Sequence, residues 1–545
     1  MPQNHVLGRN QKILLTVGVM CSLLLAALDQ TIVGTAMPRI IADLNGLDRY
    51  SWVTTAYLVT STVLTPIAGK LGDLFGRKPF LLVGMVGFMA CSWLCGASWD
   101  MNALIFFRGA QGLFGGMLFA SVFTVLADIF PPAQRARMQG LFGGVFGLAS
   151  IVGPFAGGWL TDHWGWRWVF FVNVPVGLLA VAMIATFLPF VRTQARLRDI
   201  DVFGAITLAA ALTPILIGLT LTNTHKWSDP LVVGLLAAGL LMAVAFFVVE
   251  YFEPEPIVPL VLWKNRVYLV STLTGILFAF GMFGSIIFVP LVYQGVLGVS
   301  ATNSGTLITP MMLGMIGMSV VTGQVMVRVK EYRFLGTLGA LIMAGAFYLL
   351  SLVSIHTTTW QVTGSLVMMG AGMGITFPLY INALQSAVEP KLLGVVTSNT
   401  QFWRNVGGTV ATAILGSILA NRLGPNITDQ VDAIPNLPPQ MRAGFHFNAS
   451  GGAGSAGQLF NQTALNAQRA KLPVPLRPFF DQLILGVKVG LANTLHELFL
   501  ISMVALLLAA VVSVFLPYVP LRRTSALTAG EAPPVPEAAA EAASA

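Results

Sequence analysis

The chain has 545 residues, of which 55% are hydrophobic and only 10% are charged, and its formal net charge is +8. About a quarter of the residues in a soluble domain are charged. The composition therefore excludes a soluble protein and indicates an all-α protein that crosses a membrane many times. The three cysteines, Cys21, Cys91 and Cys95, all lie in apolar runs, which argues against a disulfide framework and a metal site.

Fourteen apolar runs are long enough to cross a bilayer, which takes about 20 residues. We expect residues 1–190 to form a six-helix half and residues 266–520 a second one, with a linker and two inserted spans in residues 191–265. Two such halves are typical of transporters that bind their substrate between them. The expected spans are Ile13–Ala36, Trp52–Leu71, Pro79–Ala97, Ala103–Ala127, Met138–Leu160, Trp168–Leu188, Val202–Thr222, Leu231–Phe252, Val267–Tyr293, Thr302–Val327, Phe334–Ser354, Val362–Ser386, Val395–Ala420 and Leu498–Tyr518.

The distribution of Lys and Arg predicts the orientation of the chain. If the first residue is inside, the short outer loops hold only Arg39, Arg49, Arg167 and Lys226, and the inner segments hold most of the remaining bases. Cytoplasmic loops carry such an excess, so both termini are expected in the cytoplasm. The net charge thus reflects topology and not a nucleic-acid site. We expect a monomer in the lipid bilayer of a bacterial plasma (inner) membrane.

Two segments outside the spans have a biased composition. Residues 421–490 are expected to form a long outer loop, rich in Pro, Gly and Asn and partly disordered. Within it, Leu483–Leu495 is expected to lie as a helix along the membrane. The loop suits a lipid path or the docking of an accessory protein. Residues 521–545, rich in Ala and Pro, are expected to form a disordered cytoplasmic tail.

Two opposite charges are expected inside the membrane at similar depth. Asp29 lies 16 residues after Ile13, about 24 Å from the inner end of its span at 1.5 Å per residue. Arg108 lies five residues after the outer start of an antiparallel span, so the two side chains are expected to pair. Intramembrane carboxylates are costly and by default functional. The pair is either a static ion pair that fixes packing, or a proton carrier in which Arg108 governs proton uptake by Asp29.

A charged turn connects the second and third spans. Gly69 and Gly76 lie on either side of Asp73, and Arg77 directly follows Gly76. Asp128, at the inner end of the fourth span, is expected at the same depth as Arg77. We expect an Asp73–Arg77–Asp128 cluster that also meets the start of the thirteenth span near Gly394, because a helix N-terminus attracts acids. Such a cluster would latch the two halves on the cytoplasmic side. The alternative is an interfacial cluster that serves topology only.

Two spans carry glycines on one helical face. In the fourth span, Arg108, Gln111, Gly112, Gly115 and Gly116 recur at helical spacing. In the fifth span a second set contains glycines and a proline that can bend the helix. Either face would let a neighbouring helix approach closely, whether or not it moves. The motif in the fifth span is Gly147, Gly153, Pro154, Gly157 and Gly158, and its shared face consists of Gly143, Gly147, Ser150, Pro154 and Gly157.

These motifs resemble those of a known family. The turn spacing Gly-x-x-x-Asp-x-x-Gly-Arg-Lys resembles the loop between spans 2 and 3 of the major facilitator superfamily, although Leu74 stands where a basic residue is common. The set in span 5 is similar to the antiporter motif of drug:proton exporters. The chain therefore resembles the 14-span drug:proton antiporter family, most strongly over spans 1–6. The resemblance implies proton-driven export of amphipathic drugs, dyes or antibiotics by alternating access. Further matching residues are Trp166, Arg167, Trp168, Phe170, Phe171, Asn173, Pro175 and Gly177.

Polar and adaptable apolar side chains are candidates for the lining of a central cavity. Each aromatic or methionine is individually more often a packing residue. Spans 9 and 10 contain no acid, which disfavours a dicationic substrate. The candidate lining residues are Gln30, Gln111, Phe283, Met311, Tyr380, Gln401, Arg404 and Asn405.

Other functions are less compatible with the sequence. No phosphate-binding loop of the Gly-x-x-x-x-Gly-Lys-Ser/Thr type occurs, which argues against direct use of ATP. No His, Cys and acid constellation indicates an enzyme, and no motif indicates a cofactor. Two alternatives remain: an exporter dedicated to one endogenous compound, such as a lipid or a self-made antibiotic, and a non-transporting membrane sensor or scaffold.

Overall fold

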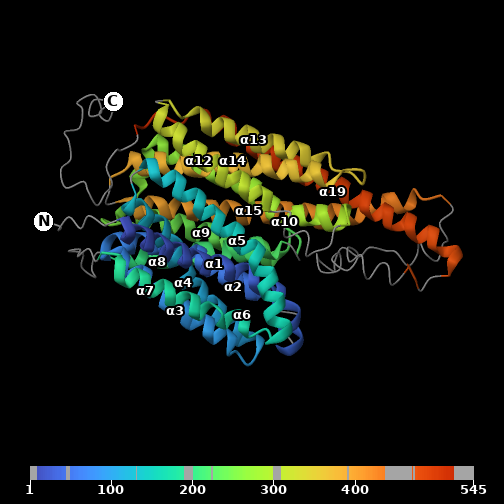
Figure 1. Ribbon diagram of the computed structural model, residues 1–545, viewed down its shortest axis with the longest axis horizontal. Coiled ribbons are helices and arrows are strands. Elements are labelled where there is room, and N and C mark those ends of the chain that lie inside the picture. Colours follow the sequence, from blue (N-terminus) through green and yellow to red (C-terminus); the bar gives the residue numbers. More distant parts are fainter. Residues whose placement is uncertain are drawn as a thin grey trace.

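The computed structural model describes the chain except residues 1–8, 45–49, 131, 190–199, 223–224, 299–308, 330, 390–391, 436–468, 471–472 and 521–545. The described residues contain helices and no strand (Figure 1). The α-helices of the described residues are α1 (Arg9–Leu44), α2 (Tyr50–Phe75), α3 (Arg77–Gly96), α4 (Met101–Ile129), α5 (Pro132–His163), α6 (Trp168–Phe171), α7 (Asn173–Phe187), α8 (Val202–Leu221), α9 (Pro230–Phe252), α10 (Arg266–Leu291), α12 (Thr309–Arg328), α13 (Phe334–Ser351), α14 (Thr359–Ala387), α15 (Leu393–Asp432) and α19 (Arg477–Val514). The expected all-α membrane fold is confirmed.

Twelve of the described helices are long and apolar enough to cross a membrane, and one of them is formed by α6 and α7 together. Two further helices, α2 and α5, have 26 and 32 residues and lie among the others. Helix α2 is slightly less apolar than the twelve because it is rich in Thr and Ser. Each of the fourteen expected spans thus coincides with helical structure, and twelve of them satisfy both length and composition over the residues that the structure describes. The predicted tail, residues 521–545, lies outside the described residues.

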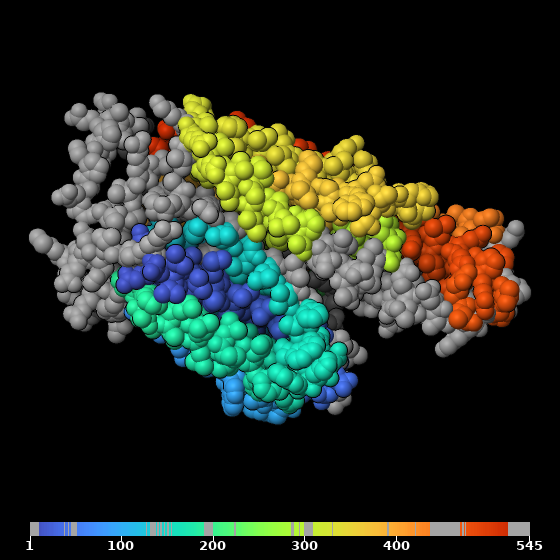
Figure 2. Space-filling model, in the orientation of Figure 1, coloured from blue at the N-terminus to red at the C-terminus, as the bar shows by residue number. Residues whose placement is uncertain are grey.

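The helices form two bundles (Figure 1). Helices α1 to α7 pack around one set of buried apolar side chains, and α10 to α19 pack around another. Between the bundles, α2 contacts α15 and α5 contacts α12; Figure 2 shows α5 against α12. The inserted pair α8 and α9 packs against itself and beside α2 and α15. We call the end of the molecule where α1 begins and α19 ends the terminal face; it lies at the left of Figure 1.

Glycines on α4 let α2 approach closely. A Cβ added at Gly116 would lie 2.5 Å from the carbonyl oxygen of Ser61, and one added at Gly112 would lie 2.9 Å from the Cα of Tyr57. Such distances leave no room for a side chain, so α2 packs backbone to backbone against α4. This contact fixes the rotation of α4 and therefore the direction in which Arg108 and Gln111 point.

The segment expected to form a long outer loop differs from the expectation. Helix α15 continues through residues 421–432, and α19 begins at Arg477, so both ends of the expected loop 421–490 are helical. Residues 483–495 belong to α19 and do not form a separate helix along the membrane. The two helix extensions project beyond the rest of the bundle as a hairpin, at the right of Figures 1 and 2.

The hairpin forms because each extension carries buried apolar residues four positions apart. They are Leu423, Ile427 and Val431 on α15 and Leu483, Val487 and Leu491 on α19. A hydrogen bond of 3.0 Å from Asn426 to Thr494 joins the two helices. The composition of the whole segment, rich in Pro, Gly and Asn, does not reveal this stripe. The expectation of a partly disordered loop was therefore wrong at both ends, which are helical.

Candidate functional site

A buried ion pair lies within the first bundle. Asp29 on α1 is fully buried, and its Oδ2 lies 2.5 Å from Nη1 of Arg108 on α4. The other carboxylate oxygen accepts hydrogen bonds of 3.0 Å from the side-chain amides of Gln111 and Asn173. The predicted contact between Asp29 and Arg108 is therefore present. Buried charges are costly unless paired and hydrogen-bonded, and these three donors offset the cost of burying this carboxylate.

Arg108 is held on several sides as well. It donates hydrogen bonds to the side-chain oxygen of Gln111 over 2.8 Å and to the backbone oxygen of Val53 over 3.3 Å. Its guanidinium lies 4.4 Å from the ring centroid of Tyr57, within the range of a cation–π interaction. Residues from α1, α2, α4 and α7 thus surround the ion pair of Asp29 and Arg108. Movement of any of these helices therefore changes the environment of Asp29.

The sequence did not identify Asn173 as a partner of Asp29, although it lies within the Trp-rich motif at the start of α7. Asn173 is fully buried and also donates a hydrogen bond of 2.9 Å to Ser92 on α3. A buried amide in an apolar span is itself a signal, since such residues mark polar interiors. That signal does not say which neighbour the amide reaches.

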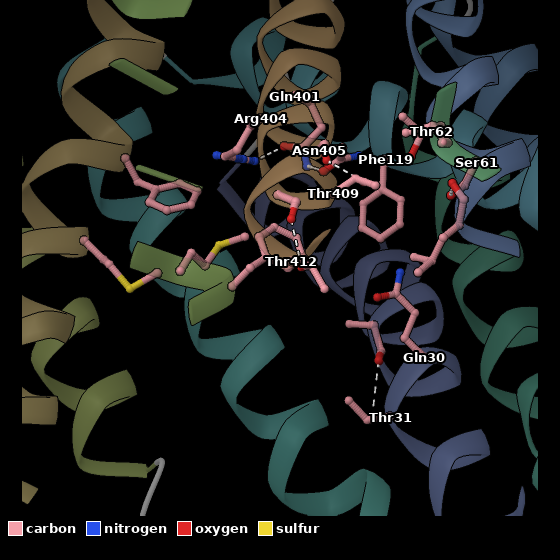
Figure 3. A pocket seen from close by; sticks show the side chains of 18 of the residues that line it. Gln30, Thr31, Ser61, Thr62, Phe119, Gln401, Arg404, Asn405, Thr409 and Thr412 are labelled. Atoms are coloured by element: carbon pink, nitrogen blue, oxygen red, sulfur yellow. Dashed lines mark hydrogen bonds between the residues drawn. The ribbon is translucent and has the colours of Figure 1, made fainter. Parts of the chain in front are cut away.

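A cavity of about 440 Å³ lies between the bundles. Its walls come from α1, α2, α4, α8, α10, α12, α14 and α15. The volume falls within the range of small-molecule sites, and the walls combine apolar side chains with a few polar ones, as such sites do. Figure 3 shows Gln401, Arg404 and Asn405 on one side of the cavity, and Gln30, Ser61 and Thr62 across from them.

Six of the eight candidate lining residues line this cavity: Gln30, Phe283, Met311, Gln401, Arg404 and Asn405. The other two, Gln111 and Tyr380, do not. Gln111 points away from the cavity, to Asp29 and Arg108. The hydroxyl of Tyr380 donates a hydrogen bond of 2.7 Å to Ser513 on α19, and its ring packs against Phe278.

Further lining residues were not predicted. Helix α2 contributes Thr55, Ser61 and Thr62, and the inserted helix α8 contributes Leu216 and Thr220. The run of hydroxyl residues along one span was a usable signal, because a lipid-facing helix has no need of them. Nothing in the sequence of α8 sets it apart from a helix that only faces lipid.

The charged turn joins the two bundles at the terminal face. Asp73 accepts hydrogen bonds from the backbone N–H groups of Gly394 and Val395, over 3.1 and 2.8 Å. Arg77 lies 3.0 Å from Asp73 and also forms an ion pair with Asp128. The three side chains and the start of α15 thus come together as expected. We call Asp73, Arg77 and Asp128 the latch cluster.

The two glycines of the turn have different environments. A Cβ added at Gly69 would overlap the side chain of Ser398 and lie 3.0 Å from the carbonyl oxygen of Gly394, so this glycine lets α2 and α15 touch. Gly76 adopts a φ of 93°, a conformation that favours glycine. It ends α2 and allows α3 to begin at the next residue.

Two segments of the chain, residues 19–201 and 202–412, match the family model described as Major Facilitator Superfamily. The chain belongs to this superfamily. It is 38% identical over 509 residues to the multidrug transporter protein MdtP of Bacillus subtilis, which covers 93% of each chain. Multidrug resistance protein 3 of Bacillus subtilis is 31% identical and covers 94% of this chain and 96% of the relative.

Two other similarities bear on function and fold. The tetracenomycin C resistance and export protein of Streptomyces glaucescens is 32% identical and covers 83% of this chain and 84% of the relative. The human organic anion transporter MFSD10 (TETRAN) has a TM-score of 0.55 at 15% identity and covers 91% of this chain and 99% of its own. At that identity the second similarity supports the fold alone.

Superfamily membership confirms the predicted resemblance, and it identifies the chain as a multi-pass membrane carrier and not an enzyme. The span 5 motif of this carrier lies against α1. Thr31 donates a hydrogen bond of 2.9 Å to the carbonyl oxygen of Ala149. A Cβ added at Gly157 would lie 2.7 Å from the carbonyl oxygen of Ile32, and one at Gly153 would overlap Thr31.

The remaining motif residues behave differently from these two glycines. A Cβ at Gly158 would meet no atom within 4 Å, so this residue permits no close approach. Gly147 and Pro154 lie within α5, and their surroundings fall outside the described part of the chain. The motif therefore contributes at least two glycines to the contact between α1, which carries Asp29, and α5, which contacts the other bundle.

An unpredicted ion pair lies near the latch cluster. The Nζ of Lys70 on α2, which is only 5% exposed, lies 2.5 Å from Glu255 in the segment after α9. This contact connects the inserted helices to the end of α2. The two residues are far apart in the sequence, so their ion pair could not be predicted from it.

Proposed function

We propose that the chain is a proton-coupled antiporter that exports amphipathic drugs, dyes or antibiotics by alternating access. Its relatives carry the names of multidrug transporters and of an antibiotic export protein. The single observation that carries the proton coupling is the fully buried carboxylate of Asp29, held by Arg108 beside the cavity-lining residue Gln30.

The proposed cycle follows from the charge of Asp29. A proton taken from the outside neutralises the carboxylate and removes its attraction to Arg108, so α1 and α4 become free to shift relative to each other. Release of the proton to the inside restores the ion pair. One proton crossing 100 mV provides about 2.3 kcal/mol, and each unit of pH difference provides about 1.36 kcal/mol. Together they concentrate a neutral substrate by roughly a few hundredfold.

The latch cluster supports the view that the structure represents one state of this cycle. Asp73 bridges the bundles at the terminal face. With both termini in the cytoplasm, as the Lys and Arg distribution predicts, the closed side is the cytoplasmic side and the structure is an outward-facing carrier. The protein acts in this scheme as a monomer of a bacterial plasma membrane, and the outer hairpin is the place where an accessory protein would dock.

The experiment uses the purified chain in liposomes with a pH-sensitive dye inside. Addition of compounds from a panel of drugs, dyes and antibiotics is expected to move protons in the wild type and not in Asp29→Asn. The matched control is Asp43→Asn, on the same helix, where the carboxylate accepts a hydrogen bond from the Trp166 indole over 2.9 Å. Proton movement that survives Asp29→Asn contradicts the proposal.

A dedicated exporter of one antibiotic is the second candidate, because one relative is named for export of a single compound, tetracenomycin C. The same panel separates the two. Responses to many unrelated compounds support multidrug export, and a response to one compound only supports the dedicated exporter. A chain that moves no proton with any compound would be a sensor or scaffold.

A further inference from the structure

The cavity contains one unusual side chain. Arg404 on α15 is the only Asp, Glu, Lys or Arg among the described residues that line it. The ion pairs of the described residues do not include Arg404. Within the described part of the chain, the Nε of Arg404 has no hydrogen-bond partner. The cavity thus presents one positive charge without a counter-charge.

The neighbours of Arg404 orient the guanidinium and leave it charged. One of its terminal nitrogens donates a hydrogen bond to the side-chain oxygen of Gln401, whose amide in turn donates to Asn405 over 3.2 Å. The ring of Phe377 lies 4.3 Å from the guanidinium carbon. These contacts fix the side chain on the cavity wall (Figure 3). An unpaired cation in a low-dielectric site is costly, and this cost falls when an anion binds next to it.

We propose that the cavity selects amphipathic organic anions, that is, compounds with a carboxylate, sulfonate or phenolate at one end and an apolar body. This inference rests on the proposed export function and names its substrate class. The planar guanidinium binds such oxyanions through two parallel hydrogen bonds. Phe283, Met311, Met312 and Met315 line the same cavity and provide an adaptable apolar surface for the rest of the molecule.

The cavity is correspondingly poor for cations. Asp29 directly precedes the lining residue Gln30 in the sequence. It is fully buried and accepts hydrogen bonds from Arg108, Gln111 and Asn173. It does not line the cavity. A cationic compound would therefore meet Arg404 and no carboxylate. Exchange of an outgoing anion for an incoming proton also moves two charges in the same electrical direction, so the membrane potential drives export of an anion more strongly than export of a cation.

The test compares three compounds that share one apolar body: pyrenebutyrate, pyrenebutanol and pyrenebutylamine. Their binding to the purified full-length protein in lipid nanodiscs is measured through pyrene fluorescence. We expect the acid to bind about ten- to a hundredfold more tightly than the alcohol, as a charge-assisted hydrogen bond would give, and the amine to bind most weakly. Equal affinities of acid and alcohol, or tightest binding of the amine, overturn the proposal.

Three variants test whether Arg404 causes the preference for the acid over the alcohol. Arg404→Gln is expected to weaken binding of the acid to the level of the alcohol, whereas Arg404→Lys keeps part of the preference. Gln401→Glu places a carboxylate where Arg404 already donates a hydrogen bond, so it neutralises the site without deleting the cation and tests the idea even if Arg404→Gln does not fold. Retention of the full preference in Gln401→Glu overturns the proposal. Because binding is measured without a proton gradient, this result is independent of Asp29 and of the proposed coupling.

Discussion

The carboxylate of Asp73 on α2 accepts a hydrogen bond of 2.8 Å from the backbone N–H of Val395, in the first turn of α15. It accepts a second one, of 3.1 Å, from Gly394. An acid from one bundle thus caps a helix of the other, where free N–H groups and the helix dipole favour negative charge. Arg77, at 3.0 Å, holds the same carboxylate in place. The contact joins the bundles at the terminal face.

Substitution Asp73→Ala is expected to open the terminal face. Loss of a side-chain cap costs about 0.5 to 2 kcal/mol, so the population with the bundles separated should rise about two- to thirtyfold. Spin labels near the end of α2 and the start of α15, in a chain whose three cysteines are replaced by serine, report the distance. The control is Asp128→Ala, which loses an ion pair to Arg77 within the first bundle. A distance distribution of Asp73→Ala that equals that of the wild type would show that the latch cluster serves topology only.

Variants of the ion pair between Asp29 and Arg108 distinguish its contribution to stability from its role in proton coupling. Removing one partner of a buried pair leaves an uncompensated charge and costs about 3 to 5 kcal/mol. Asp29→Asn and Arg108→Gln should therefore each lower the unfolding temperature, and the double variant should recover most of the loss. Proton-linked export should remain absent in all three. Recovery of both stability and export in the double variant would make the pair a static packing element.

The depth of these groups was predictable from the sequence, and their rotation was not. Counting residues at a fixed helical rise predicted that Asp29 and Arg108 lie at one depth. The expected N-terminus of the thirteenth span, which attracts acids, predicted that Gly394 lies near Asp73. Whether a side chain faces the cavity depends instead on rotation about the helix axis. That rotation is set by contacts such as Gly116 against Ser61, which the sequence does not specify.

Gln111 and Tyr380 show the consequence. Each lies on a helix that lines the cavity, yet each points toward a polar partner elsewhere, Gln111 to Asp29 and Tyr380 to Ser513. A buried polar group is directed by its hydrogen-bond partner, and the partner here is distant in sequence. The hairpin of α15 and α19 was missed for a related reason, because its apolar stripe is stable only when two segments meet.

The hairpin of α15 and α19 offers a matched pair of glycines. A Cβ added at Gly490 would lie 2.8 Å from the carbonyl oxygen of Asn426, whereas one at Gly486 would make an ordinary contact at 3.6 Å. Gly490→Ala is expected to force the two extensions apart and to speed amide hydrogen exchange in residues 423–431. Gly486→Ala should leave exchange unchanged or slow it, since alanine favours the helix by about 0.5 to 1 kcal/mol. Similar exchange in both variants would mean that the extensions do not pack as described.

Gly157 and Gly158 of the span 5 motif are expected to tolerate substitution by alanine differently, although both belong to the same sequence motif. A Cβ at Gly157 would lie 2.7 Å from the carbonyl oxygen of Ile32, and a Cβ at Gly158 meets nothing within 4 Å. Gly157→Ala should push α5 away from α1 at a cost of about 1 to 3 kcal/mol, and the displacement should reduce export because α1 carries Asp29.

The measurement is thermal unfolding of the purified variants together with proton-linked export in liposomes. Gly158→Ala, made in the same helix by the same change, should unfold at the wild-type temperature or slightly above it and export normally. If Gly158→Ala abolishes export while Gly157→Ala does not, the motif acts through a face of α5 other than the one that contacts α1. Loss of export in both variants, without loss of stability in Gly158→Ala, would instead assign Gly158 to a second state of the carrier in which the free side of α5 becomes a contact.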